Sequence, residues 1–236
     1  MLEKIAVFFD VDDTLLDNYS AFKCTIENFF PEEFSDEVFL KQLYRDFRGN
    51  SEKIYQKFQE GQLNTKQNYN RWYSVLEGLN QKDYLEIIAL DEYYHFCQSK
   101  QRLSTEMVML LNVLKKSKIF CGILTNGFTQ QQQKKLDQLG MDLYIEPKWQ
   151  FISEDLGDTK PNVSCFKKVA SQLPAEIAQI YYLGDSYKND IAPAHLARWN
   201  PIWLNRFADE GELLVPQATT NKEVVELLLS KLLTIK

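Results

Sequence analysis

Residues 5–16 read IAVFFDVDDTLL, and the interpretation of the whole chain starts from this stretch. Its first five residues, Ile5 to Phe9, are apolar and rich in branched and aromatic side chains, which is typical of a strand buried on both faces of a sheet. Four polar residues follow at once: Asp10, Asp12, Asp13 and Thr14. Because three carboxylates within four residues repel one another, the pattern indicates either a bound hard cation or a solvated turn at the strand end.

The composition limits the classes of partner. A chain of 236 residues is long enough for one core with a smaller inserted domain. The net charge of −6 gives the surface no general attraction for nucleic acid or for an anionic membrane, so we expect neither as a partner. Four cysteines lie far apart without metal-finger spacing, and no signal peptide or apolar run of about 20 residues is present. These features predict a cytoplasmic protein with reduced thiols.

From Asp17 to about Gln98 the apolar and aromatic residues recur at helical spacing, and no strand pattern is found. One stripe runs from Ala21 to Phe30, a second from Val38 to Phe47 and a third from Ile54 to Phe58, and a last helix is expected over about residues 83–96. We therefore predict an all-helical insert at residues 17–98, directly after the first strand.

Strands and helices alternate in the rest of the chain. Strands are predicted at Ile119–Leu124, near Phe151, at Ile180–Leu183 and near Pro201–Leu204, with helices between them. Strands separated by helices of this length predict an α/β fold, a Rossmann-like doubly wound parallel sheet formed by residues 1–16 and 99–236.

Polar residues follow each predicted strand, at the edge where an open parallel sheet binds ligands. They are Asp10, Asp12, Asp13 and Thr14 after the first strand, Thr125, Asn126 and Gly127 after the second, Lys160 in the next loop, and Asp185, Ser186, Asn189 and Asp190 after the fourth. Such a set suits Mg²⁺ together with a phosphate group, because Mg²⁺ prefers carboxylate oxygens and a lysine with backbone amides neutralises the phosphate. Taken singly, Thr125 could cap a helix, Lys160 could be a solvated loop residue, and Asp185 and Asp190 could be acids at a helix start.

These four groups of residues, in this order, resemble the four motifs of the haloacid dehalogenase-like (HAD) hydrolase superfamily, and the helical insert resembles that family's C1 cap. The resemblance implies that Asp10 is the nucleophile and Asp12 the general acid and base, with Thr125, Asn126 and Lys160 holding the phosphate. It also implies that Asp10, Asp12 (through its carbonyl) and Asp185 bind Mg²⁺. Thr14, Gly127, Ser186, Asn189 and Asp190 would support the site, with Asp190 either near the metal or bound to Lys160. Asp13 is given no role.

The resemblance also narrows the reaction. The superfamily includes dehalogenases, phosphonatases, phosphomutases and phosphatases, and Asp12 favours phosphoryl transfer because the dehalogenase branch lacks this second aspartate. The stretches ILTNGF (123–128) and FISEDLGDTKP (151–161), together with the insert residues 55–61, are similar to YjjG-type pyrimidine 5′-nucleotidases and secondarily to N-acylneuraminate-9-phosphatases. We therefore expect a phosphatase acting on a small phosphorylated metabolite, preferably a pyrimidine nucleoside monophosphate.

Other functions stay open at this point. A sugar-phosphate phosphatase or a phosphomutase would share the same core, and a phospho-accepting signalling domain would share the acids, threonine and lysine, although such domains lack a helical insert. In the insert, Tyr44, Phe47, Tyr55 and Trp72 could stack on a base or could simply pack the core. Arg45, Arg48 and Arg71 could contact substrate or form salt bridges. The sequence does not specify an oligomeric state.

Overall fold

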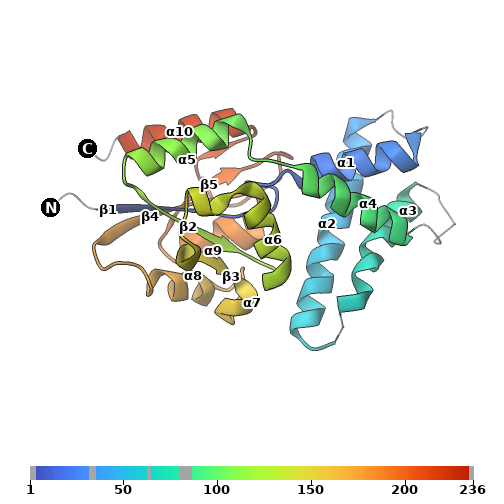
Figure 1. Cartoon of the computed structure of the whole chain (residues 1–236), viewed down its shortest axis with the longest axis horizontal. Helices are drawn as coiled ribbons and strands as arrows, with labels where there is room; N and C mark the ends of the chain where they lie inside the picture. The colour runs from blue at the N-terminus through green and yellow to red at the C-terminus, as the bar shows by residue number, and fades with distance from the viewer. Residues whose placement is uncertain (1–3, 32–35, 63–64, 80–86, 234–236) are drawn as a thin grey trace. The chain divides into compact units, whose positions relative to one another are not determined.

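The computed structural model describes residues 4–31, 36–62, 65–79 and 87–233. The chain divides into two compact units, Met1–Leu16 with Arg102–Lys236 and Asp17–Gln101, which are described separately below (Figure 1). Within the described residues, no helix is both long enough and apolar enough to cross a membrane.

The first unit contains a six-stranded sheet in which all neighbouring strands are parallel, with the order β3-β2-β1-β4-β5-β6. The strands are β1 (Lys4–Phe9), β2 (Phe120–Thr125), β3 (Gln150–Ile152), β4 (Ile177–Gly184), β5 (Asn200–Leu204) and β6 (Gln217–Ala218). This order confirms the predicted Rossmann-like sheet. Only the short edge strand β6 was not expected, because two residues carry no detectable periodicity.

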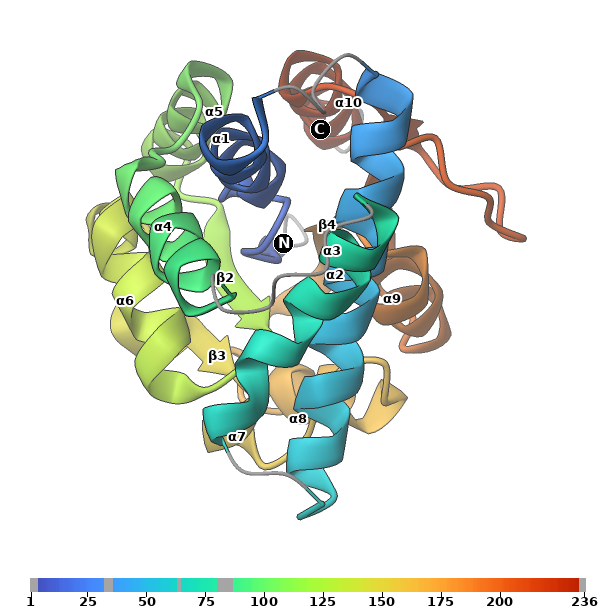
Figure 2. The ribbon, with the colours of Figure 1, turned by 90° about the vertical axis from the view of Figure 1, so that its right-hand side faces the viewer.

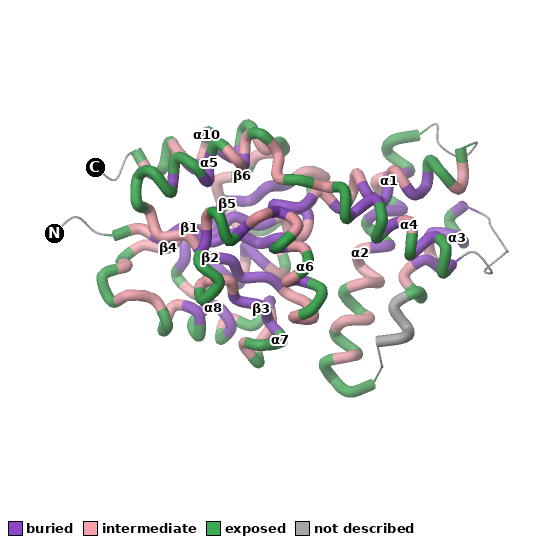
Figure 3. Tube along the Cα trace, in the orientation of Figure 1, coloured by how far each residue is buried: buried purple, intermediate pink, exposed green. Residues whose placement is uncertain are grey.

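Helices cover both faces of this sheet. Successive side chains of β1 point to opposite faces, and both sets are apolar, so each face needs a covering layer. Val7 and Phe9 pack with leucines of α5 (Thr105–Lys116), α6 (Thr129–Leu139) and α10 (Asn221–Leu233), whereas Ala6 and Phe8 pack with α8 (Val163–Ala170) and α9 (Ala192–Leu196). Figure 2 shows α5 and α10 on one side of the strands and α8 on the other. The strands are therefore mostly buried, as their colouring in Figure 3 shows.

The remaining elements of this unit are short. They are the 3₁₀ helices η3 (Met141–Leu143) and η4 (Pro147–Trp149), the helix α7 (Ser153–Leu156) and the π-helical turn η5 (Tyr187–Ile191). Two of the helices have typical caps: Ser104 Oγ accepts from the Met107 amide at 3.2 Å at the start of α5, and Gly140 ends α6 in the left-handed conformation with φ of 65°.

The second unit is helical throughout its described part. Its elements are α1 (Asn18–Phe29), α2 (Glu37–Gln59), the 3₁₀ helix η2 (Thr65–Trp72), α3 (Tyr73–Gly78) and α4 (Ile87–Lys100). The two stripes expected at residues 38–47 and 54–58 belong to one helix, α2, which continues through Gly49 between them. The start expected near residue 83 lies outside the described residues.

Aromatic side chains form the core of this unit. Tyr44, Phe47 and Trp72 are each at most 1% exposed, and all three pack around the Phe22 ring with centroid distances of 5.2 to 5.8 Å. Their burial and mutual packing identify these three residues as core side chains, which is the second of the two interpretations given above.

An ion pair between Arg71 and the buried Asp91 packs against the same core. Arg71 donates from Nε to Asp91 Oδ1 at 3.0 Å, and the indole of Trp72 donates to the same oxygen at 2.9 Å. Burial raises the pKa of Asp91, but His95 and Arg71 outweigh this effect and hold the pKa below its usual range. Arg71 therefore forms a salt bridge, one of the two uses the sequence left open.

Replacing Asp91 with alanine should destabilise the helical unit by about 3 kcal/mol, because the Arg71 guanidinium would be left without its carboxylate in a largely apolar site. Urea unfolding followed by tryptophan fluorescence measures the change. The exposed neighbour Glu92 provides the control, and Glu92→Ala should change the free energy of unfolding by less than about 0.5 kcal/mol. Equal midpoints for the two variants would contradict the assignment.

Candidate active site

The candidate site lies at the carboxyl ends of the three central strands. In the order β2-β1-β4 the middle strand ends before Asp10, β2 ends at Thr125, and β4 ends before Asp185. Because adjacent parallel strands end at the same edge, residues more than 100 positions apart in sequence become neighbours here. Asp10 itself continues the ladder, since its amide donates to Leu183 O at 2.9 Å.

A tight turn follows Asp10. The carbonyl of Val11 accepts from the amides of Leu15 and Leu16, both at 2.9 Å, which folds the chain back on itself. Asp13 takes the left-handed conformation with φ of 59°, which aspartate adopts more readily than most residues, and its carbonyl accepts from Arg206 Nε at 3.0 Å. Asp13, which received no role from the sequence, is thus a turn residue.

Lys160 links two of the predicted acids. Its Nζ atom donates to Asp10 Oδ1 at 2.7 Å and to Asp190 Oδ1 at 2.6 Å. The side chains of all three residues are at most 7% exposed. An ammonium group buried to this degree is stabilised only where carboxylates and further hydrogen bonds replace its water. The structure therefore brings Asp10, Lys160 and Asp190 together, and Asp190 binds Lys160.

Tyr182 is part of the same cluster and was missed by the sequence analysis. Its hydroxyl accepts from Lys160 Nζ at 2.9 Å and lies 2.8 Å from Leu124 O and 3.1 Å from Asp190 Oδ1. Burial, followed by the charges of Asp190 and Asp10, raises the pKa of Tyr182 well above its ordinary value, so the hydroxyl stays protonated. The strand pattern predicts that Tyr182 is buried, but it does not predict a polar partner for the hydroxyl.

Asn126 fixes the backbone of Lys160. Its side-chain amide donates to Lys160 O at 2.8 Å, and its Oδ1 atom accepts from the Lys160 amide at 3.0 Å. The Asn126 side chain thus holds the loop that carries the lysine, and its predicted contact with phosphate would have to come from the backbone. Gly127 next to it donates its amide to Ser153 Oγ at 3.0 Å, which ties this turn to α7.

The loop after β4 places Asp190 by local hydrogen bonds. Ser186 donates its amide to Asp190 Oδ2 at 2.9 Å, and Ser186 Oγ accepts from the Asn189 amide at 3.2 Å. Gly184 is required at the strand end because a Cβ atom there would lie 2.6 Å from the Asp190 side chain. Trp203 Nε1 donates to Asp185 O at 2.7 Å and fixes the backbone of the remaining acid.

The electrostatics of the cluster favour added positive charge. Burial raises the pKa of Asp10, and although the Lys160 charge opposes this, the charges of Asp190 and Asp12 raise it further. The pKa of Lys160 is also raised: its burial acts downward, but the charges of Asp10 and Asp190 dominate and keep the ammonium protonated. One lysine thus compensates several acids only in part.

The acids also meet the requirements of a divalent cation site. One carboxylate oxygen from each of Asp10, Asp185 and Asp190 lies within 4.8 Å of the others, and Asp185 is partly exposed. Hard oxygen ligands of this kind suit Mg²⁺. Since both oxygens of Asp190 accept hydrogen bonds from Lys160 or Ser186, Asp10 and Asp185 are better suited to a metal than Asp190.

Asp12 has partners that the sequence analysis missed. Lys135 Nζ donates to both oxygens of the Asp12 carboxylate, at 2.6 and 2.8 Å, and Gln132 Nε2 donates to Oδ2 at 3.0 Å. Gln132 Oε1 in turn accepts from the Thr125 hydroxyl at 3.4 Å, and Thr125 is 1% exposed. Gln132 and Lys135 lie three positions apart in α6 and therefore share one face of that helix. Thr14 is also buried, at 1% exposure.

Comparison with known proteins agrees with the fold described above. The family described as haloacid dehalogenase-like hydrolase matches residues 7–203. The protein YfnB of Bacillus subtilis, named a HAD-hydrolase, is 27% identical over 202 residues, covering 84% of this chain and 83% of YfnB. A solved structure of YfnB bound to magnesium superimposes with a TM-score of 0.70, covering 96% of this chain and 99% of that one at 23% identity.

Two further relatives have named activities. Pyrimidine 5′-nucleotidase YjjG of Escherichia coli is 28% identical over 222 residues, covering 91% of this chain and 92% of YjjG. Glyceraldehyde 3-phosphate phosphatase of Methanothermobacter thermautotrophicus is 25% identical over 210 residues, covering 88% of each chain. The fold and the acidic sheet edge define a hydrolase of the HAD type. With the family match over residues 7–203, this chain belongs to the haloacid dehalogenase-like hydrolases.

Replacing Gly184 with alanine should disrupt the Lys160 cluster. The new methyl group would displace the Asp190 side chain, at a cost of about 1–3 kcal/mol in the free energy of unfolding. Gly49 in the middle of α2 has nothing within 4 Å of an added Cβ, so Gly49→Ala should stabilise the protein by about 0.5–1 kcal/mol. Chemical denaturation of both variants tests the difference, and a neutral effect of Gly184→Ala would contradict the packing described.

Proposed function

We propose that this protein is a Mg²⁺-dependent phosphatase that hydrolyses small phosphomonoesters through a phosphoryl group carried on Asp10. The observation that best supports the proposal is the buried contact of Asp10 with Lys160, beside two further carboxylates at the edge of a HAD-type sheet. A carboxylate held in this way can act as a nucleophile whose orientation is set before the substrate binds.

In the first step, a carboxylate oxygen of Asp10 attacks the phosphorus atom. A new O–P bond forms, the ester P–O bond breaks, and the leaving alkoxide takes a proton from Asp12. Lys160, already 2.7 Å from Asp10, neutralises part of the charge on the phosphoryl oxygens. The Thr125 hydroxyl, which donates to Gln132 Oε1 in this structure, would turn to the phosphoryl group and donate to it together with the Asn126 amide.

In the second step, Asp12 acts as the base. It removes a proton from a water molecule, the resulting hydroxide attacks the phosphorus, and the Asp10 O–P bond breaks to release inorganic phosphate. Asp12 is thereby protonated again and ready for the next substrate. Asn126 contributes by holding the Lys160 backbone in place during both steps.

The residues that would hold Mg²⁺ are Asp10, Asp185 and the backbone carbonyl of Asp12, with Asp190 adjacent. When bound there, the ion supplies positive charge that favours the ionised form of Asp10 and neutralises the phosphate. The support for this assignment is the 4.8 Å spread of the three carboxylates.

As substrate we propose a nucleoside 5′-monophosphate, with a preference for pyrimidines. The support is similarity over most of both chains to a protein named pyrimidine 5′-nucleotidase. Sugar phosphates are the second candidate class, favoured by a relative named glyceraldehyde 3-phosphate phosphatase. This second class includes N-acylneuraminate 9-phosphate as a substrate. A phosphomutase acting on a sugar phosphate is the corresponding alternative reaction.

Steady-state assays with Mg²⁺ should show many turnovers, with the highest kcat/KM for dUMP, dTMP or UMP among a panel that includes glyceraldehyde 3-phosphate, hexose phosphates and N-acylneuraminate 9-phosphate. EDTA should remove the activity and added Mg²⁺ should restore it. A highest kcat/KM for a sugar phosphate would move the assignment to the second class. One stable phosphoryl group per molecule, without turnover, would instead indicate a signalling domain.

Replacing Asp10 with asparagine should lower kcat by about 10³-fold or more, because an amide oxygen cannot form the phosphoryl intermediate. The control is Asp209→Asn, since Asp209 lies on the exposed segment after β5. Circular dichroism should show that both variants fold. Substantial turnover by Asp10→Asn would exclude Asp10 as the nucleophile.

A further inference from the structure

The ion pair between Lys135 and Asp12 is partly buried. The two side chains are 16% and 13% exposed, so this contact is not a solvated surface bridge of the kind that contributes little. Lys135 reaches both carboxylate oxygens and Gln132 reaches one of them, which gives the Asp12 carboxylate three donor contacts from one helix, α6. A carboxylate with that many donors is restricted to one orientation.

Gln132 is itself held from two sides. Its Oε1 atom accepts from the Thr125 hydroxyl, and its Nε2 atom donates to Asp12. Gly127, with φ of 145°, leaves the necessary room, since a Cβ atom at that position would lie 2.6 Å from Gln132 Nε2. The turn after β2 thus leaves space for the Gln132 side chain, which joins Thr125 to Asp12.

We propose that Lys135 and Gln132 are positioning residues that hold the Asp12 carboxylate in the orientation from which it exchanges a proton with the leaving group and with water. This inference rests on the proposed function, in which Asp12 is the general acid and base. Lys135 would touch neither the substrate phosphate nor the nucleophile, and would act only through Asp12, whereas Gln132 also holds Thr125. Loss of Lys135 should therefore slow proton transfer and leave substrate binding unchanged.

The test compares two substrates that differ in their need for a proton. Lys135→Met should lower kcat/KM about 10- to 100-fold for a nucleoside monophosphate, whose alkoxide leaving group must be protonated. For p-nitrophenyl phosphate, whose leaving group departs without a proton, the loss should stay below about threefold. A merely structural role of Lys135 would lower both values alike.

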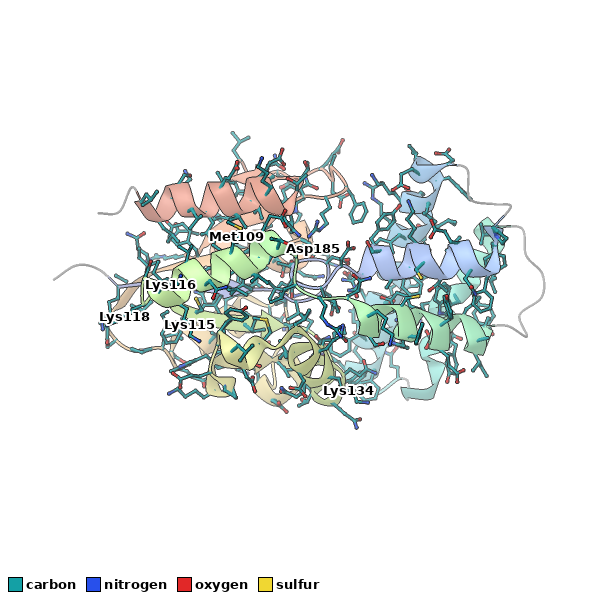
Figure 4. All side chains as sticks on the ribbon, turned by 45° about the horizontal axis from the view of Figure 1, so that its top comes forward. Met109, Lys115, Lys116, Lys118, Lys134 and Asp185 are labelled. Atoms are coloured by element: carbon teal, nitrogen blue, oxygen red, sulfur yellow. The ribbon has the colours of Figure 1, made fainter. Side chains whose placement is uncertain are left out.

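Three further variants sharpen the comparison. Lys135→Arg keeps a cationic donor, so the ratio of kcat/KM for the two substrates should stay close to that of the wild type. In an Asp12→Asn background, Lys135→Met should cause no additional loss, because residues that act as a unit are not additive. Lys134→Met is the matched control, since Lys134 is exposed on the same helix and points away from it (Figure 4), and its kinetics should equal those of the wild type.

The outcomes separate this inference from the function on which it rests. Suppose that the wild type turns over both substrates. Equal losses of kcat/KM for the two substrates in Lys135→Met, or losses that add to those of Asp12→Asn, would then overturn the inference alone. A wild type that hydrolyses neither ester would overturn the proposed function as well. If Lys135→Met fails to fold, Lys135→Gln, which keeps a polar side chain but removes the charge, should show the same substrate-dependent loss. A crystal structure of whichever variant folds should show Asp12 in an altered rotamer, and an unmoved carboxylate would count against the inference.

Discussion

The ammonium group of Lys160 lies in the interior of the sheet unit, between Asp10 and Asp190, and its charge cannot be left uncompensated there. The residues around Lys160 each help to hold this charge in place. Asn126 fixes the lysine backbone, Tyr182 supplies a further oxygen, and Gly184 leaves space for Asp190. A buried pair of this kind gives little net stability, but removal of one partner is costly. The cluster is therefore better explained as an arrangement that holds Asp10 in one orientation than as a source of stability.

A second ion pair, Lys135 with Asp12, is partly buried at the same edge of the sheet. Its acid lies in the same turn as Asp10, but its lysine comes from α6 and not from the loop that carries Lys160. The two pairs hold the two carboxylates to which the chemistry is assigned, one for attack on phosphorus and one for proton transfer. Both depend on the parallel order β2-β1-β4, because only that order brings the ends of these strands together. The fold thus brings the two acids to one edge of the sheet, and a lysine from another segment of the chain orients each of them.

Much of this arrangement could be predicted from the sequence. The strand periodicity predicted five of the six strands, and the polar residues after them predicted which side chains would meet, as the Asp10, Lys160 and Asp190 contacts confirm. Periodicity identifies the face of an element on which a residue lies, but it does not identify a polar partner. Lys135 is separated from Asp12 by 123 residues, and Tyr182 is a regular strand position, so neither contact had a local signal. Likewise, an aromatic side chain in the insert can either stack on a base or pack in the core, and its residue type does not distinguish these two roles. Only the burial seen in the structure does so.

The proposed reaction depends most on the transfer of a phosphoryl group to Asp10, and acid-quench trapping measures this transfer directly. The protein would be mixed with Mg²⁺ and radiolabelled phosphomonoester, quenched in acid within milliseconds, digested and sequenced. We expect a hydroxylamine-sensitive acyl phosphate on the peptide that contains Asp10, formed and lost at rates no slower than kcat. Label on a different residue, or multiple turnovers without any labelled peptide at early times, would contradict it.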